Sequence, residues 1–153
     1  MGSDHGTRCG GAAAGFALVE LVVVLGLTAA LLLLAAPRWL QWQDRTRVSR
    51  AAVELAQFYQ AARYAAILRA TRVRIEFTGD TLAAVYEHAA GDSAFLERPG
   101  PARHGVSLSA TRAAIRIGPT GLGYGAANTT LIVRRGAAAD TLTTSRLGRL
   151  KRW

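Results

Sequence analysis

The chain has 153 residues, half of them apolar, a formal charge of +9 and a single cysteine, Cys9. One cysteine excludes an intramolecular disulfide and a metal site built on several thiolates. The densest apolar block lies near the N-terminus, so the length fits a membrane segment followed by one soluble domain with a core of modest size.

The net charge is distributed unevenly along the chain. Residues 16–97 hold eight arginines and eight acidic residues, which cancel, as do Asp4 and Arg8 before them. Residues 98–153 hold nine arginines, one lysine and one acid, Asp140, so the whole excess of +9 lies in the last third. A one-sided basic surface is typical of a protein with an anionic partner, although solvated surface arginines give the same pattern.

Residues 16–36 form an apolar run of 21 residues whose only charged side chain is Glu20. As a helix this run spans ~30 Å, the thickness of a bilayer core. A secretory signal peptide has a shorter apolar region with a basic stretch before it, whereas the 15 residues here carry no net charge. A plain signal anchor explains the length, and leaves Glu20 as a carboxylate that reaches the nearby membrane interface.

The stretch GFALVEL at residues 15–21 resembles the N-terminal signal of type IV pilins and type II secretion pseudopilins. In that family a peptidase cuts after the glycine and methylates the new N-terminal residue. A glutamate stands fifth in the mature chain and a proline often stands twenty-second, the places held here by Glu20 and Pro37. The resemblance implies cleavage between Gly15 and Phe16, methylation of Phe16 and a role for Glu20 in filament assembly.

Cleavage of this kind would explain why a carboxylate, Glu20, stands in an apolar run. Cleavage exposes an amine at Phe16 that is mostly cationic at neutral pH. The Glu20 carboxylate of one subunit can neutralise the amine of its neighbour, because a paired buried charge is tolerable where an isolated one is costly. Pro37 lacks an amide donor and is expected to kink the helix where the chain leaves the membrane.

The arginines around the apolar run disagree with the orientation that the resemblance implies. Arg8 precedes the run, whereas Arg38, Arg45, Arg47 and Arg50 follow it. Taken alone, this distribution places the residues after the run in the cytoplasm. The resemblance implies the opposite: a single-pass protein of the bacterial inner membrane with its C-terminal head in the periplasm.

Residues 39–70 contain no glycine or proline and are rich in helix-forming residues. Apolar side chains recur in this stretch at spacings of three and four, which predicts an amphipathic helix that packs on a head domain. The aromatic pair Phe58 and Tyr59 is expected in the core. A helix over residues 16–70 is therefore predicted, and the apolar positions are Val48, Ala52, Leu55, Phe58 or Tyr59, Ala62 and Ala66.

The pattern of residues after position 70 predicts a series of short strands. Alternation predicts strands at 73–77 and 82–86, joined by a turn at Thr78-Gly79-Asp80, with Arg74 and Glu76 as an exposed pair. A loop is expected over 89–105, and further strands at 106–108, 114–117, 129–133, 141–144 and 149–151.

This order of elements predicts an α+β fold, in which a long N-terminal helix packs on an antiparallel β-sheet head. The expected divisions are a leader at 1–15, a membrane and filament-core helix at 16–37, its amphipathic continuation at 38–70 and a β-rich head at 71–153.

Catalysis finds little support in the sequence. His88 and His104, the only histidines after the leader, have no acidic partner at a telling spacing and no cysteine beside them. The stretch GLGYGA at 121–126 mimics a dinucleotide-binding turn, but a strand follows it where a helix is required, so a flexible loop is expected. We therefore predict a protein that is not an enzyme, with no cofactor and no metal.

The basic residues near the C-terminus are candidates for nucleic-acid binding. Arginine forks suit phosphates, and on an extended strand Arg149 and Lys151 project to one face. Such binding would follow the phosphate backbone and be indifferent to base sequence. A charged edge that prevents strand-to-strand aggregation is the alternative. The candidates are Arg134, Arg135, Arg146, Arg149, Lys151 and Arg152.

The head resembles the protein H pseudopilins and the related minor pilin T group. The resemblance is carried by AARYAAILRATRVRIEF, IRIGPTG, TLIV and the terminal TTSRLGRLKRW, whose closing motif Gly148-Arg149-Leu150-Lys151 has lysine where the group has arginine. It implies a structural minor subunit of a type II secretion pseudopilus, with other pseudopilins or pilins, prepilin peptidase and the inner membrane as partners. The alternative is a minor type IV pilin that binds DNA during DNA uptake.

Overall fold

The computed structural model describes residues 11–89, 91–125 and 128–153, without the side chains of residues 11–16 and 34–37. The chain divides into two compact units, residues 1–40 and 41–153. In the described part the first unit consists of helix, whereas the second contains the end of the same helix and two β-sheets. Cys9 lies outside the described residues.

Helix α1 (Gly11–Leu68) begins five residues before the predicted start and ends two residues before the predicted end. Its C-terminus is closed by two hydrogen bonds, from Ala70 N–H to the Ile67 carbonyl and from Thr71 N–H to the Ala66 carbonyl. These bonds form a Schellman motif, in which Ala70 adopts the left-handed conformation (φ 47°) that glycine more often supplies. The motif turns the chain directly into the first strand.

The apolar stripe predicted for the second half of α1 is buried against the sheets. Phe58 and Tyr59 are each 1% exposed, which confirms their place in the core. The stripe forms because residues three and four apart share one face of a helix. Its buried members are Val48, Ala51, Ala52, Leu55, Phe58, Tyr59, Ala62 and Ala66.

The first sheet has five antiparallel strands in the order β3-β2-β1-β5-β6. Alternation along β1 sends Val73, Ile75 and Phe77 to the core, as the sequence predicts, and Arg74 and Glu76 to the outer face. The strands are β1 (Arg72–Phe77), β2 (Thr81–Glu87), β3 (Ser93–Pro99), β5 (Ala114–Ile117) and β6 (Gly123–Tyr124).

The second sheet has four antiparallel strands in the order β4-β7-β8-β9. β7 and β8 form a hairpin that is longer than predicted, because its register continues from Thr129 opposite Thr144 to Arg135 opposite Ala138. The strands are β4 (Ser107–Ala110), β7 (Thr129–Arg135), β8 (Ala138–Thr144) and β9 (Leu150–Arg152).

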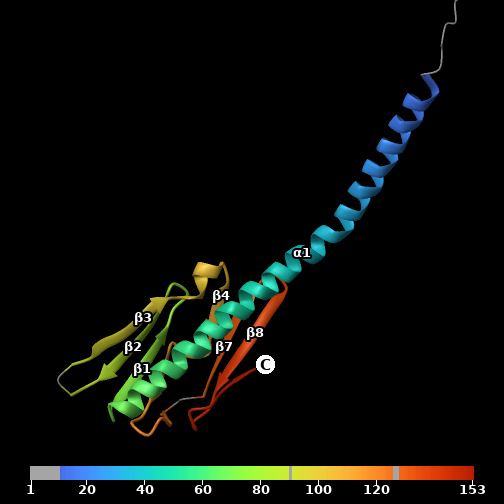
Figure 1. Ribbon diagram of the computed structural model, residues 1–153. Coiled ribbons are helices and arrows are strands. Elements are labelled where there is room, and N and C mark those ends of the chain that lie inside the picture. Colours follow the sequence, from blue (N-terminus) through green and yellow to red (C-terminus); the bar gives the residue numbers. More distant parts are fainter. Residues whose placement is uncertain (1–10, 90, 126–127) are drawn as a thin grey trace, which may run out of the picture. The chain divides into compact units, whose positions relative to one another are not determined.

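Both sheets cover α1 in the second unit, so the head has one core (Figure 1). The first sheet contributes Ile75 and Ile115, and the second contributes Leu131 and Leu142, all at most 1% exposed. The α+β architecture of a long helix and antiparallel sheets is therefore confirmed.

The loop predicted over residues 89–105 is wrong for most of that stretch. Residues 93–99 form β3, and Pro101–His104 form the short 3-10 helix η1. β3 pairs with β2 alone and buries no side chain fully, so it lacks the apolar alternation that marks a strand in the sequence. An exposed edge strand of this kind ends naturally at Pro99, which cannot donate to a further ladder.

Candidate functional site

The first unit presents an unburied apolar helix. Every side chain from Ala17 to Leu33 is exposed, and the large apolar ones range from 53% exposed at Val23 to 77% at Leu33. Among the described residues one helix, Ala17–Leu68, is long and apolar enough to cross a membrane, as judged from length and composition. Apolar surface of this extent needs a lipid or protein partner, because monomeric soluble proteins rarely expose it.

Glu20 is the only charged side chain on this exposed stretch. The other polar groups of a membrane helix usually bond to their own backbone, as the Thr28 hydroxyl does when it donates to the Val24 carbonyl at 2.7 Å. Glu20 forms no ion pair with any residue that the structure describes. A carboxylate in an apolar environment is costly unless a cation neutralises it.

The backbone of Gly15, Phe16 and Pro37 lies within α1, which runs through Pro37 without interruption. The side chains of these residues lie outside the described part of the chain. Cleavage after Gly15, methylation of Phe16 and the kink at Pro37 stay predictions.

Three of the six candidate nucleic-acid residues lie on the outer face of the second sheet. β7 and β9 alternate, so that Arg134 and Lys151 point away from α1, and the exposed Arg149 precedes Lys151 on the same side. The Lys151 ammonium lies 3.4 Å from the centroid of the Trp153 ring, whose indole N–H donates to the Thr143 hydroxyl at 3.2 Å. Within the described residues none of these three cations is paired with an acid.

Arg135, also a candidate, belongs to the interior side of the sheet. Its Nε lies 2.6 Å from Oδ1 of Asp44 on α1, and its Nη1 donates to the Gly105 carbonyl at 2.6 Å. The guanidinium thereby ties the β7–β8 hairpin to the helix and to the end of η1. Arg135 therefore has a structural role in the head, and nucleic-acid binding by this residue stays a prediction.

Arg152 also makes contacts that stabilise the fold. Its Nε donates to Oδ2 of Asp140 at 2.7 Å, and its Nη2 donates to the Ser49 hydroxyl on α1 at 2.8 Å. Asp140 is only 8% exposed, so its charge needs this partner. Arg152 neutralises the carboxylate of Asp140 and fastens β9 to the helix, and nucleic-acid binding by this residue stays a prediction.

Arg146, the sixth candidate, lies in the turn between β8 and β9, and its side chain is exposed. Its carbonyl accepts a hydrogen bond from Gly123 N–H at 2.8 Å. The Arg63 guanidinium donates to the Gly121 carbonyl at 2.9 Å. The stretch expected to be a flexible loop is thus held at Gly121 and Gly123 and contributes the short strand β6; Ala126 lies outside the described residues.

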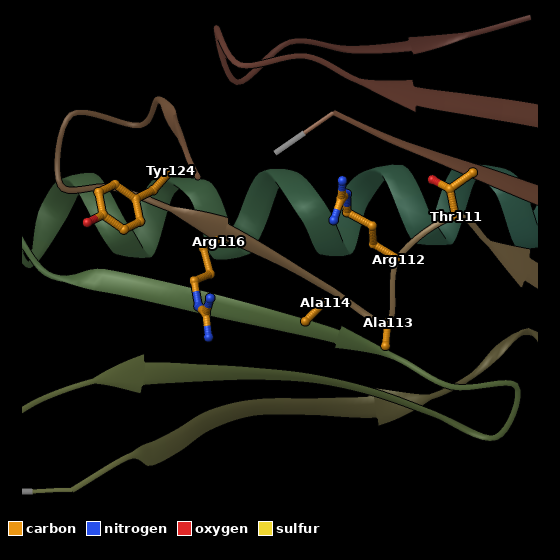
Figure 2. Close-up of a pocket in the computed structure, with 6 residues that line it drawn as sticks. All are labelled: Thr111, Arg112, Ala113, Ala114, Arg116 and Tyr124. Atoms are coloured by element: carbon orange, nitrogen blue, oxygen red, sulfur yellow. The ribbon is translucent and has the colours of Figure 1, made fainter. Parts of the chain in front are cut away.

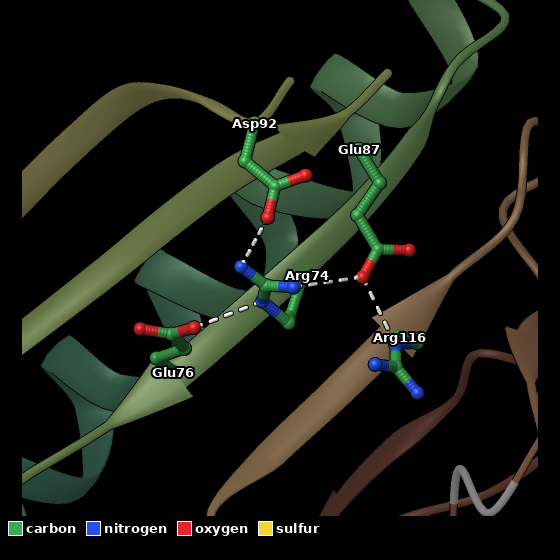
Figure 3. A network of polar contacts seen from close by, with 5 residues as sticks. All are labelled: Arg74, Glu76, Glu87, Asp92 and Arg116. Carbon is green, nitrogen blue, oxygen red and sulfur yellow. Dashed lines mark hydrogen bonds and ion pairs between the residues drawn. The ribbon is translucent and has the colours of Figure 1, made fainter. Parts of the chain in front are cut away.

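The predicted exposed pair Arg74 and Glu76 is part of a larger network on the outer face of the first sheet (Figure 3). Arg74 contacts Glu76 at 2.8 Å, Glu87 at 3.3 Å and Asp92 at 2.5 Å, and Arg116 contacts Glu87 at 2.9 Å. The hydrogen bond to Asp92 is the largest effect that raises the pKa of Arg74 above its ordinary value. The network links β1, β2 and β5, so these ion pairs hold neighbouring strands of the first sheet together.

A hollow of about 390 Å³ adjoins the same sheet beside β5 and β6. Figure 2 shows the Arg112 and Arg116 guanidiniums pointing in opposite directions, so they do not converge on one small anion. The Tyr124 ring makes a cation–π contact with Arg72, whose guanidinium carbon lies 4.6 Å from the ring centroid. The lining residues are Thr111, Arg112, Ala113, Ala114, Arg116 and Tyr124.

His104 has an acidic partner that its local sequence does not reveal. Its Nε2 lies 2.9 Å from Oε2 of Glu54 on α1, and Arg103 Nη2 lies 2.6 Å from Oε1 of the same carboxylate. Burial alone raises the pKa of Glu54 and is the largest effect, but the hydrogen bonds from Arg103 and His104 outweigh it and lower the pKa. The cluster fastens η1 to the helix. Its members stand about fifty residues apart, so no local pattern could predict it.

Comparisons with known proteins identify the family from a family model and the fold from a solved structure. A model of the family described as type II transport protein GspH matches residues 51–148, more than half of the chain. No curated protein matches. The crystal structure of the type IV minor pilin FimU from Pseudomonas aeruginosa (strain PAO1) is similar at a TM-score of 0.60 and 18% identity, over 70% of this chain and 88% of that one.

The family match covers most of the packed part of α1, the first sheet and strands β4, β7 and β8 of the second sheet, and it ends at Gly148, before β9. FimU supports the fold alone at this level of identity. The match over the head and the exposed apolar helix before it lead to one conclusion: the chain belongs to the GspH family of type II transport proteins and is a pilin-like subunit, a pseudopilin or minor pilin.

Proposed function

We propose that the protein is a minor subunit of a type II secretion pseudopilus that takes part in protein secretion across the outer membrane. It is inserted into the inner membrane as a single-span precursor with its head in the periplasm. Prepilin peptidase cleaves it after Gly15 and methylates Phe16, and the 16–36 helix then joins those of other pseudopilins. The observation that supports this most is an unburied apolar helix with one carboxylate, Glu20, attached to a GspH-family head.

The physical argument rests on the two environments that the apolar helix meets. In the bilayer its side chains replace contact with water by contact with lipid, and in a filament they pack against other helices. Glu20 is costly in either place unless a cation neutralises it. Cleavage at Gly15 supplies that cation on the neighbouring subunit, as the new amine of Phe16.

Mass spectrometry of the protein purified from membranes of its native host tests this proposal. We expect a chain that begins at Phe16 and carries one additional methyl group. Gly15→Leu should leave residues 1–15 attached, because the peptidase requires a small residue before the cut. Gly26→Ala is the matched control in the same helix, where an added Cβ meets no described atom within 4 Å outside the adjoining helix backbone. A wild-type chain that keeps residues 1–15 would contradict the proposal.

A DNA-binding minor type IV pilin is the second candidate function. It is favoured by the outer face of the second sheet, where Arg134, Arg149 and Lys151 stand without an acidic partner among the described residues and Trp153 is 71% exposed. Three phosphate contacts would weaken binding about 40-fold between about 50 and about 200 mM salt. The exposed indole offers a surface on which one base can stack.

A gel shift with single- and double-stranded DNA at two salt concentrations tests the second candidate. Arg149→Ala/Lys151→Ala should abolish a shift seen at low salt, because it removes two of the three outward cations. Arg47→Ala/Arg98→Ala is the control, since it removes the same charge from exposed positions away from the second sheet. A wild-type protein that does not shift DNA at low salt would exclude this function.

A further inference from the structure

Helix α1 carries tryptophans directly after the apolar run. At the end of the first unit Trp39 is 60% exposed and Leu40 is 61% exposed, and at the start of the second unit Trp42 is 59% exposed. Tryptophan is enriched where a membrane meets water, because its ring is apolar and its N–H can bond to the interface. The position of these rings in the chain is therefore that of a membrane-interface belt.

Arginines surround the tryptophans in the chain. Arg38, Arg45, Arg47 and Arg50 are all exposed, and none forms an ion pair with a residue that the structure describes. Asp44 is the one acid between positions 38 and 50, and its carboxylate is held by Arg135 at 2.6 Å. The arginines of this stretch keep their charge available for an anionic partner outside the chain.

The distance along the helix decides which arginines can reach lipid headgroups. At ~1.5 Å per residue, Arg45 and Arg47 lie at most ~14 and ~17 Å beyond Ala36, whereas Arg50 lies up to ~21 Å beyond it. Headgroups extend roughly 5–8 Å from the apolar core of a bilayer. Helical side chains lean toward the N-terminus, here toward the membrane, so the long side chain of Arg45 comes within reach, and that of Arg47 does so when the helix is tilted.

We propose that residues 38–47 bind the anionic phospholipid headgroups of the membrane leaflet that faces the head. Trp39 and Trp42 lie in the interface, while Arg38, Arg45 and Arg47 contact phosphates; Arg50 lies beyond them. The inference rests on the proposed function, because it requires the 16–36 helix to span the membrane. It also accounts for the arginines that follow the apolar run. By the positive-inside rule these arginines would place the head in the cytoplasm, whereas here they bind lipid headgroups on the opposite side.

The test uses the full chain in vesicles of phosphatidylcholine and phosphatidylglycerol, with tryptophan fluorescence quenched by lipids brominated at a shallow or a deep position of the acyl chain. A Trp153→Phe variant reports on Trp39 and Trp42 alone. We expect stronger quenching by the shallow bromine than by the deep one. A Trp39→Phe/Trp42→Phe variant, which retains Trp153, should be quenched by neither, because its indole bonds to Thr143 on the head.

The choice of headgroup is measured in the Trp153→Phe background, from quenching by brominated phosphatidylglycerol and by brominated phosphatidylcholine at equal fractions. We expect the anionic lipid to associate about fivefold more strongly or better, since each arginine at an anionic surface is worth about that factor. Arg45→Gln/Arg47→Gln should bring the two lipids close to equal. Arg50→Gln/Arg98→Gln removes the same charge from outside residues 38–47 and should leave the preference unchanged.

Alkaline extraction of the vesicles separates the two proposals. A chain that resists extraction and shows no quenching of Trp39 and Trp42 overturns the interface belt but leaves the membrane anchor intact. A chain that is extracted overturns both. Equal quenching by the two lipids in the Trp153→Phe background overturns the recognition of anionic headgroups. It is also overturned if Arg50→Gln/Arg98→Gln loses as much of the preference as Arg45→Gln/Arg47→Gln does.

Discussion

Gly148→Ala is expected to destabilise the head by roughly 2–4 kcal/mol. Gly148 adopts a left-handed conformation (φ 70°), and a Cβ at this position would overlap the Gly121 carbonyl oxygen. It would also lie 3.0 Å from Nε of Arg63, the group that holds the Gly121 carbonyl. The glycine of the closing motif is thus required by the contact between the β8–β9 turn and the 118–123 segment.

Gly125→Ala is the control that separates the two effects on stability. Gly125 also has a positive φ (66°), but an added Cβ would meet nothing within 4 Å among the residues that the structure describes. This variant should cost only about 1 kcal/mol, the conformational part alone. Urea denaturation of the full chain in detergent measures both variants. If Gly148→Ala unfolds at the same urea concentration as Gly125→Ala, the close approach to Gly121 does not limit stability.

Glu20→Gln is expected to reduce incorporation into the filament by about 100-fold or more. If the proposed function holds, the variant leaves the Phe16 amine of a neighbouring subunit without its counter-charge in an apolar helix bundle, and breaking a buried ion pair costs about 3–5 kcal/mol. Cleavage should continue, because the peptidase acts at Gly15. The measurement is the fraction of the chain that copurifies with sheared filaments from the native host.

Two variants sharpen the interpretation of the Glu20 result. Glu20→Asp keeps the charge on a shorter side chain and should recover part of the incorporation. Thr28→Val removes a polar group that bonds only to its own helix, at the Val24 carbonyl, and should assemble as the wild type does. If Glu20→Gln assembles normally, the carboxylate is a tolerated charge near the membrane edge and has no role in polymerisation.

The strands that alternate were predictable from the sequence, and those at the edge were not. β1 and β5 are buried on one face, so their apolar and polar residues alternate visibly at 73–77 and 114–117. β3 has no fully buried residue, and its sequence therefore looks like a loop. β7 and β8 were predicted too short, because their ends at Arg135 and Ala138 are fixed by hydrogen-bonded register.

The basic surface near the C-terminus could likewise be predicted from the sequence only in part. The sequence counts charges and, through alternation, places Arg149 and Lys151 on one side of a strand. It does not reveal that Arg135 is paired with Asp44, which stands 91 positions earlier, or that Arg152 neutralises Asp140. Half of the six candidates remain on the outer face, and the free charge there is smaller than the excess of +9 indicates.

The sequence by itself determined the apolar run, its single carboxylate, the amphipathic helix after it and the alternating strands, because each depends on neighbours within one turn or one strand. Only the tertiary structure decided which arginines are available to a partner. That choice depends on which face of the second sheet α1 covers and on acids far away in the chain, such as Asp44 on α1, and these meet only when the helix and both sheets close around one core.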